Sequence, residues 1–300
     1  MPSGTVSGII MKYKREEIVY ALVLIAPFIL AYTLFLIYPT IYQISLSFQK
    51  APLVGTGEWI GLENYSKLIN DKLFWKALSN TGIFVLWTVV PNTLLGLMFA
   101  MMVIRHRPIF QAIILACFFI PHILPVTVVT EMWTWLLSKQ FGIFQEVLDY
   151  FDTKRINFFT NRYWAMPMVA FITIWWTIGF NIVLFIAGLR NINPEIYEAS
   201  EMEGASRIQQ FRYITWPLIW PVTALVLTLQ LIFQMKIFDQ MYLLTGGGPF
   251  NSTLVVLQLV YNKAFQNNDG GYAAAISLVL FGIILITSIL QYQVLKKQDD

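Results

Sequence analysis

Long uninterrupted apolar runs are the feature of this sequence that most limits its fold. A helix needs about 20 apolar residues to cross the hydrocarbon core of a bilayer, because each residue rises 1.5 Å through a core about 30 Å thick. Pro121 and Pro125 interrupt one of the runs that reach this length. The sequence therefore predicts an all-α integral membrane protein with six transmembrane helices, at residues 18–37, 82–104, 109–137, 163–189, 217–235 and 273–295.

The composition supports this fold class and excludes several kinds of function. Apolar residues make up 57% of the chain and charged residues only 12%, whereas soluble domains carry roughly 25% charged residues. The net charge of +3 is too small to indicate nucleic-acid binding. One cysteine and two histidines allow no intramolecular disulfide and leave little scope for a zinc or haem site, so we expect no metal site.

Basic residues precede the first apolar run, as they precede the apolar region of a cleaved signal peptide. The run is longer than the roughly 7–15 apolar residues of a signal peptide, and Tyr38 and Pro39 follow it instead of a small-residue cleavage site. We interpret it as a retained helix. The predicted organisation is a tail at residues 1–17, a transmembrane domain at 18–295 and a tail at 296–300, with the natural start at Met1 or Met11 left open.

The distribution of Lys and Arg predicts the orientation of the chain. These residues are about twice as dense in the segments on the side of the two termini as in the opposite segments, and basic loops remain in the cytoplasm. Arg105 and Arg107 lie in a four-residue hairpin between two spans. We therefore expect both termini in the cytoplasm.

Motifs of the common enzyme classes are absent. The chain has no GxxxxGK[ST] phosphate-binding loop, no HExxH, no GxSxG and no dinucleotide fingerprint. We expect no catalytic residues, which disfavours a membrane enzyme acting on lipid or isoprenoid substrates. No two halves of matching length are evident, which disfavours a self-contained secondary transporter built from repeats.

The loop at residues 190–216 predicts a pair of short helices. Asn-Pro-Glu at 193–195 is a strong helix start, because it combines a capping side chain, a proline at the first position and an acid near the positive end of the dipole. Gly204 can adopt the left-handed conformation that ends a helix. Ser206 and Gln209 have the spacing of a capping box, so a second helix should begin there.

This predicted helix pair is well capped but too short to form a domain, which favours docking to a partner protein. The alternative is a pair of helices lying on the lipid headgroups. An anionic leaflet would repel the acids that the first helix carries, which are Glu195, Glu198, Glu201 and Glu203.

The segment EASEMEGA at residues 198–205, with Pro217 and Pro221 behind it, resembles the EAA loop of the permease subunits of binding-protein-dependent ATP-binding-cassette (ABC) importers. The resemblance implies a type I importer permease fold whose cytoplasmic EAA-type helix pair couples to an ATPase subunit. Trp216 stands where that family often has Leu. The residues implied in coupling are Glu198, Ala199, Ser200, Glu203, Gly204 and Ala205, of which Ser200 and Glu203 replace the usual Ala and Asp.

Further motifs resemble the carbohydrate-uptake branch of that family and extend the resemblance to residues 18–295. They are YPTIYQISLSF at 38–48, GLENYSKLINDKLFWKALSNT from Gly61, IPHILP at 120–125 and LLTGGGPFNST at 243–253. The last is similar to the maltose-permease-like and glycerol-phosphate-permease-like member of the usual pair.

The resemblance also implies an assembly and a location. The chain would form half of the translocation pathway for a sugar or polyol in a prokaryotic cytoplasmic (inner) membrane. Its partners would be a second homologous permease subunit, two ATPase subunits and an extracytoplasmic solute-binding protein. We expect no cofactor in this chain, because ATP and Mg²⁺ would bind to the ATPase subunits.

Polar side chains within the spans are candidates for the solute route, because amides facing lipid are costly and hydroxyl-rich solutes need donors and acceptors. Residues four apart share a helix face, and the family's sugar contacts come from the fourth and fifth spans. The candidates are Thr173, Thr177, Phe180 and Asn181 in the fourth span and Gln230 and Gln234 in the fifth. Interhelical hydrogen bonds, or bonds from threonine to its own backbone, are the alternative roles.

Two further interpretations concern the pathway. We interpret His122 as a hydrogen-bonded structural histidine between two prolines. The absence of Arg and Lys within the predicted spans disfavours a phosphate ester as solute. A stand-alone secondary transporter or channel for small polar solutes is the alternative function, and it leaves the capped acidic loop without a partner.

Overall fold

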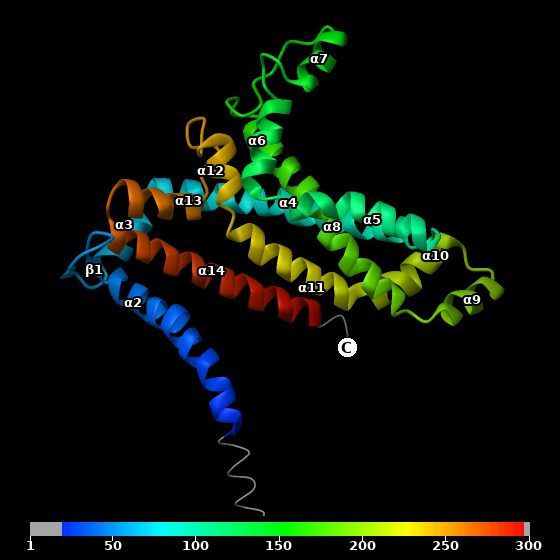
Figure 1. Cartoon of the computed structure of the whole chain (residues 1–300), viewed down its shortest axis with the longest axis horizontal. Helices are drawn as coiled ribbons and strands as arrows, with labels where there is room; N and C mark the ends of the chain where they lie inside the picture. Colours follow the sequence, from blue (N-terminus) through cyan, green and yellow to red (C-terminus); the bar gives the residue numbers. More distant parts are fainter. Residues whose placement is uncertain (1–19, 297–300) are drawn as a thin grey trace, which may run out of the picture.

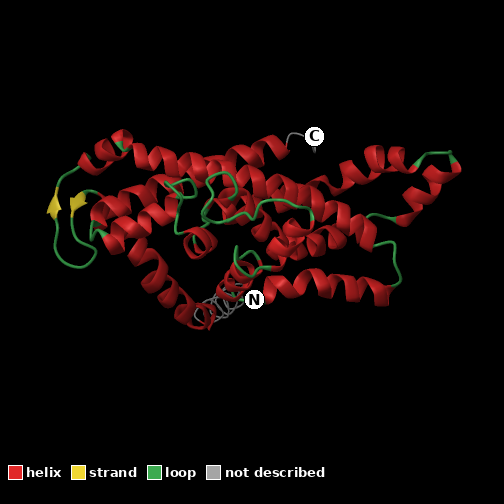
Figure 2. Cartoon of the chain, turned by 90° about the horizontal axis from the view of Figure 1, so that it is seen from above, coloured by secondary structure: helices red, strands yellow, loops and turns green. Residues whose placement is uncertain are grey.

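The computed structural model describes residues 20–296, and these are almost entirely helical (Figure 1). The predicted tail at 1–17 and all but the first residue of the predicted tail at 296–300 lie outside the described residues. Helices α4, α5, α8, α11 and α14 run along the long axis, and both views show them side by side (Figures 1 and 2). Their packing is centred on α8, which contacts α4, α5 and α11.

Five helices of the described chain are long and apolar enough to cross a membrane. They overlap five of the predicted spans, with ends that differ because several helices continue beyond the apolar run. Their bounds are Tyr20–Ser47 (ending in η1, Thr33–Ile37, and α2, Tyr38–Ser47), Lys72–Val103 (α4), Ala165–Arg190 (α8), Arg207–Met235 (ending in α11, Trp216–Met235) and Gly270–Gln291 (within α14, Gly270–Lys296).

The third predicted span, residues 109–137, is not one straight helix. It consists of α5 (Pro108–Ile123) and α6 (Val126–Leu136), which are bent by 99° relative to each other. The break lies at Leu124, which has an extended backbone and precedes Pro125, because a residue before proline is disfavoured from the helical conformation. Pro121 lies inside α5 without ending it.

A glycine allows α5 to approach α8 closely. Gly179 is in the middle of α8, and a Cβ atom added there would overlap the backbone carbonyl of Phe118 in α5. Small residues at helix interfaces let backbones pack tightly within a membrane. Further along α8, Ile182 and Phe185 are completely buried, in a cluster with residues of α4 and α11.

The second helix of the predicted pair is continuous with the fifth span. Residues Arg207–Gln210 (α10) pass through one π-helical turn, Phe211–Thr215 (η2), into α11. We call the loop at residues 190–216 the coupling loop. One helix of 29 residues, Arg207–Met235, therefore joins this loop to the interior of the bundle. The first helix of the pair, α9 (Pro194–Met202), is separate and lies at one end of the molecule (Figure 1).

Short elements cover the opposite end of the bundle. They are the antiparallel pair β1 (Gln49–Lys50) and β2 (Glu58–Trp59), α3 (Glu63–Asn70), α13 (Val256–Tyr261) and η3 (Asn262–Gln266). Helix α12 (Asp239–Thr245) and an arm made of α6 and α7 (Ile143–Tyr150) rise from the side of the bundle (Figure 1).

A polar cluster joins α3 and α4 to α14 at this end. The hydroxyl of Tyr272 donates to Asp71 Oδ2 at 2.7 Å, and Lys67 Nζ lies 2.9 Å from Asp269 Oδ2. Partial burial raises the pKa of Asp71, but hydrogen bonds from Tyr272 and from the Leu73 backbone outweigh it, so the pKa lies below its usual value. The charged form of Asp71 therefore helps to fix α14 against α4.

Candidate functional site

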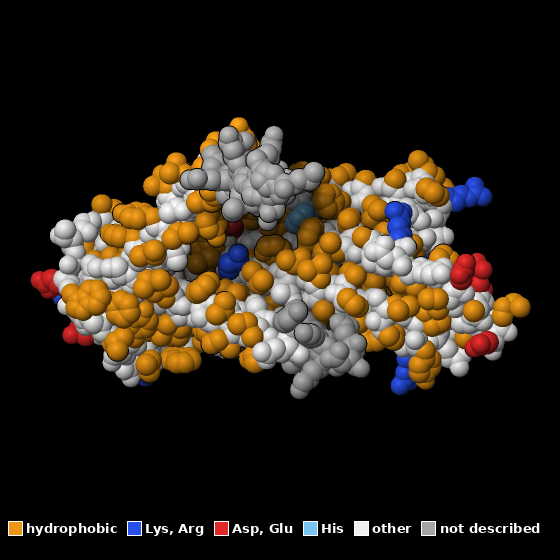
Figure 3. All heavy atoms as spheres, turned by 90° about the horizontal axis from the view of Figure 1, so that it is seen from below, with side chains coloured by type: hydrophobic (Ala, Val, Ile, Leu, Met, Phe, Trp, Pro, Cys, Tyr) orange, Lys and Arg blue, Asp and Glu red, His pale blue; other side chains and the backbone are white. Residues whose placement is uncertain are grey.

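A cavity of about 330 Å³ opens between α5, α8 and α11. Five of the six candidate pathway residues line it: Thr173, Thr177, Phe180, Gln230 and Gln234. The other lining residues are His122, Trp176, Phe233, Lys236, Ile237, Phe238, Asp239 and Gln240. A space-filling view shows a hollow in a largely apolar face, with a histidine and a basic side chain beside it (Figure 3). We call this space the central cavity.

A network of buried amides forms one wall of the central cavity. Gln230 Nε2 donates to Asn181 Oδ1 at 2.9 Å, and Gln234 Nε2 donates to Gln230 Oε1 at 3.2 Å. Asn92 Nδ2 donates to Thr177 Oγ1 at 2.8 Å and, more weakly, to Gln230 Oε1 at 3.4 Å. The network joins α4, α8 and α11. The interhelical bonds considered from the sequence are therefore present, and three of the bonded side chains, Thr177, Gln230 and Gln234, also line the cavity.

Asn181 differs in position from the other candidates. Its side chain is completely buried, lies outside the cavity lining, and also donates from Nδ2 to the backbone oxygen of Asn92. Thr173 and Thr177 donate their hydroxyls to backbone oxygens one turn earlier in α8. Their remaining oxygen lone pairs can still accept hydrogen bonds.

Two ring nitrogens at the central cavity are buried without hydrogen-bond partners. They are His122 Nδ1 and Trp176 Nε1, and the two ring centroids lie 6.2 Å apart. The His122 ring also lies 5.7 Å from that of Phe180. Because most buried polar atoms in folded proteins are paired, the two nitrogens are suited to a ligand's hydroxyl groups. The His122 ring has a hydrogen bond with the Trp176 backbone, as its interpretation as a hydrogen-bonded structural residue requires, but Nδ1 has no partner.

The charges at the central cavity are balanced. Lys236 follows the last residue of α11, and Asp239 begins α12. Within residues 20–296 neither forms an ion pair. A cavity with one positive and one negative group, two glutamines and aromatic rings offers both donors and acceptors to an uncharged, hydroxyl-rich solute.

Sequence reasoning did not place Asn92, Lys236 and Asp239 at this site. Asn92 was recognisable as an amide within an apolar span, which is a costly position unless paired. Lys236 directly follows the fifth apolar run, so its position at the cavity depends on how the chain turns after that run. No sequence pattern predicts this turn.

The coupling loop has the local structure that the sequence predicts. Asn193 caps α9 by accepting from the Glu195 N–H at 3.1 Å. Gly204 ends this helix at φ +82°, and the Ala205 N–H bonds to the Ser200 carbonyl as in a Schellman motif. Ser206 and Gln209 form both bonds of the capping box.

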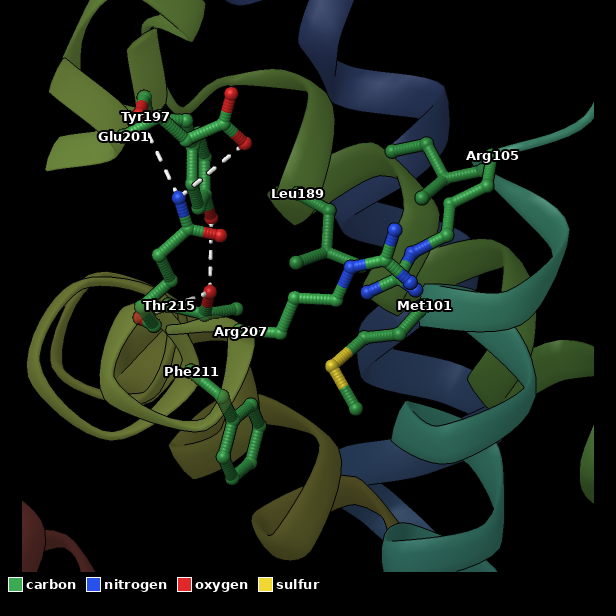
Figure 4. Close-up of a pocket in the computed structure, with 10 residues that line it drawn as sticks. Met101, Arg105, Leu189, Tyr197, Glu201, Arg207, Phe211 and Thr215 are labelled. Carbon is green, nitrogen blue, oxygen red and sulfur yellow. Dashed lines mark hydrogen bonds between the residues drawn. The ribbon is translucent and has the colours of Figure 1, made fainter. Parts of the chain in front are cut away.

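Side-chain bonds hold α9 against the start of the long helix. Tyr197 Oη lies 2.9 Å from Thr215 Oγ1, and Gln210 Nε2 donates to Ser200 Oγ at 3.0 Å. Figure 4 shows Tyr197, Glu201 and Thr215 around this junction. The two parts of the coupling loop are therefore connected as a unit.

Most of the coupling loop is exposed. Helix α9 has no buried residue. Of the candidate coupling residues, Glu198, Ala199, Glu203 and Gly204 are exposed, whereas Ser200 and Ala205 are half-buried. Met202 and Ile208, which flank the glycine corner, are 90% and 79% exposed. A well-capped helix with acidic and apolar side chains in the open has the character of a protein docking surface.

No cluster suitable for a metal ion is found in the described part of the chain, where no group of three or more His, Cys, Asp or Glu side chains could hold one.

Comparisons with known proteins agree with this architecture. The family model described as "Binding-protein-dependent transport system inner membrane component" matches residues 92–299. The arabinooligosaccharides transport system permease protein AraP of Halalkalibacterium halodurans is 30% identical over 95% of this chain and 90% of its own length. The trehalose/maltose transport system permease protein MalF of Thermococcus litoralis is 28% identical over 95% of each chain.

A solved structure has the same fold. It is a bacterial ABC transporter involved in the import of the acidic polysaccharide alginate, with a TM-score of 0.85 over 96% of this chain and 98% of that chain at 22% identity. A second structure of an alginate transporter, in complex with alginate pentasaccharide-bound periplasmic protein, also has a TM-score of 0.85.

Proposed function

The chain belongs to the family of binding-protein-dependent transport system inner membrane components, and we propose that it is the permease subunit of an importer for a saccharide or related polyol. Membership makes it a multi-pass, non-catalytic subunit of an ABC transport complex that works with a solute-binding protein. The nature of the solute, the other subunits and the orientation are part of the proposal.

The central cavity is the observation that supports a saccharide most directly. It combines aromatic rings, which can stack on a sugar ring, with the amides of Gln230 and Gln234 and two unpartnered ring nitrogens. The balance of Lys236 against Asp239 favours an uncharged solute. Relatives such as AraP and MalF carry names of saccharide transporters, which agrees with this chemistry.

The remaining parts of the assembly follow from the family and the coupling loop. We place the termini and α9 in the cytoplasm, where α9 docks on one of two ATPase subunits that hold ATP and Mg²⁺. A second homologous permease completes the pathway. In this scheme Glu198, Ala199, Ser200, Glu203, Gly204 and Ala205 transmit closure of the ATPase subunits to the bundle.

Substitution of Gly204 tests the coupling role. An added Cβ atom meets nothing within 4 Å in this chain, so a bulky side chain there disturbs only the left-handed corner and whatever docks on it. We expect Gly204→Phe to lose ATPase association and ATP-driven uptake in proteoliposomes. Gly204→Asn is the matched control, because asparagine tolerates positive φ, and it should keep more of both.

Two results would contradict the proposal. If Gly204→Phe keeps ATPase association and uptake, the loop does not couple. If the purified chain alone transports solute in liposomes without ATP, the chain is a stand-alone transporter.

A further inference from the structure

A second cavity, of about 370 Å³, lies between the end of the bundle and the coupling loop (Figure 4). It is lined by the end of α4, the end of α8, helix α9 and the start of the long helix, and it is separate from the central cavity. We call it the basal cavity. Its lining includes Arg105, Arg207 and Glu201.

Two arginine residues line the basal cavity. Arg105 belongs to the turn between α4 and α5, and Arg207 is the first residue of α10. Figure 4 shows both arginine side chains, with Met101, among the residues that line this cavity. Among the described residues neither arginine forms an ion pair. The acid in the lining, Glu201, instead accepts a weak hydrogen bond from Gln210 Nε2 at 3.4 Å. Two positive side chains that line one cavity and have no ion-pair partner favour the binding of an anion between them.

An exposed apolar stripe leads along α4 to this pair. Leu94, Met98 and Met102 are 55%, 41% and 55% exposed, and they are spaced four apart with Arg105 three residues further on. They therefore share one helix face with Arg105. From Leu94 to Val103, where α4 ends, the helix rises about 14 Å, close to half of a hydrocarbon core about 30 Å thick. Arg105 follows in the next turn, so the stripe and this arginine together span about the depth of one leaflet.

We propose that the basal cavity binds the phosphate of an anionic phospholipid, with an acyl chain lying along the Leu94–Met102 stripe. The four-residue turn that carries Arg105 joins two helices of the bundle, which places this side chain at the depth of the headgroups. Basic groups between helix ends at this depth attract anionic headgroups. The lipid bridges the bundle, through Arg105, to the base of the coupling loop, through Arg207.

This bridge gives the lipid a role in coupling. A phosphate bound to both arginines holds the start of the long helix against the end of α4. The end of α4 therefore moves together with the coupling loop. The inference uses the proposed orientation only to say that the lipid belongs to the cytoplasmic leaflet.

Lipid retention by the purified native complex tests this site. The complex is placed in nanodiscs of phosphatidylcholine with increasing phosphatidylglycerol of the same chains, and bound lipids are counted by native mass spectrometry after release. We expect the wild-type complex to retain one phosphatidylglycerol, and Arg105→Gln with Arg207→Gln to weaken its retention at least tenfold. Arg212→Gln is the matched control, because Arg212 belongs to the same loop but stacks on Tyr213 outside the basal cavity.

The possible outcomes separate the sources of the anion. Loss of retention in the double Gln variant, together with loss of any stimulation of ATPase activity by phosphatidylglycerol, supports the proposal. Equal retention of both lipids by the wild-type complex would overturn it, and this measurement needs no variant. Displacement of phosphatidylglycerol by millimolar inorganic phosphate would assign the site to a free phosphate instead.

A third result would identify a protein partner. If the double Gln variant loses its ATPase subunits while lipid retention is unchanged, the arginines pair with carboxylates of that subunit and the lipid proposal is wrong. Where the Gln variants fail to assemble, Arg105→Lys with Arg207→Lys keeps both charges and should keep selective retention in part.

Discussion

Gln230 joins three helices through side-chain hydrogen bonds, and its replacement by methionine tests whether these bonds hold the bundle together. The side chain is 2% exposed. It donates to Asn181 in α8 and accepts from Asn92 in α4 and from Gln234 in its own helix. Methionine has a similar length and keeps the apolar contacts, but it neither donates nor accepts strongly.

The expected loss of stability follows from the number of bonds. Side-chain hydrogen bonds between transmembrane helices contribute about 0.6 kcal/mol each on average. Gln230→Met removes two such bonds and one bond within α11, for which i, i+4 pairs give about 0.2–0.5 kcal/mol, so the free energy of unfolding should fall by about 1.5 kcal/mol. Gln234→Met removes only the bond within α11, for which we expect about 0.2–0.5 kcal/mol. Titration with sodium dodecyl sulfate in mixed micelles, followed by tryptophan fluorescence, measures both values.

The ratio between the two variants is the decisive quantity. If Gln230→Met and Gln234→Met destabilise the bundle equally, or if Gln230→Met has no measurable effect, the network does not act as an interhelical clamp. Uptake should respond differently, because both side chains also line the central cavity. We expect Gln234→Met to reduce uptake in proteoliposomes far more than its small loss of stability explains.

Three further predictions concern packing, pH and the central cavity. Gly179→Ala should lower the free energy of unfolding by about 1–3 kcal/mol through overpacking of α5 against α8. Gly82→Ala is the control and should change this free energy little, because a Cβ atom added there meets nothing within 4 Å. The titration with sodium dodecyl sulfate compares the two variants. Because the pKa of Asp71 is lowered, the stabilisation from its charged form should be present above about pH 4 and lost as the pH falls through the folded-state pKa. Between pH 6 and pH 3 the melting temperature should therefore fall less steeply for Asp71→Asn than for the wild-type protein. Parallel curves for the two proteins would contradict this. His122→Phe removes an unpartnered buried nitrogen, so this variant should keep or raise the melting temperature while it lowers uptake. Unchanged uptake would mean that His122 does not contact the solute.

Much of the fold could be predicted because it depends on local patterns. Five of the predicted spans overlap helices that can cross a membrane, since the length of an apolar run is itself the requirement for a span. The caps of the coupling loop at Asn193, Gly204 and Ser206 were predicted for the same reason, because each cap involves residues only a few positions apart.

Other features depend on contacts between distant residues. The prolines predicted an interruption of the third span, but not the 99° bend between α5 and α6, because the direction after a break is set by packing. Helical spacing grouped Asn181 with Thr177, yet only the packing of α4 and α11 against α8 turns Asn181 away from the cavity. Arg105 and Arg207, about 100 positions apart, line one cavity, and no local pattern predicts this.

Because the helix Arg207–Met235 is continuous, a tilt at one of its ends would displace the other end. Its π-helical turn, Phe211–Thr215, lies at the coupling end, and Gln234 lies about 28 Å further along at 1.5 Å per residue. A tilt of about 10° at that turn would move the far end by about 5 Å, roughly half the spacing of packed helix axes. A small rotation at the coupling loop would thus produce a displacement large enough to reshape the central cavity, without any bending of α11 itself.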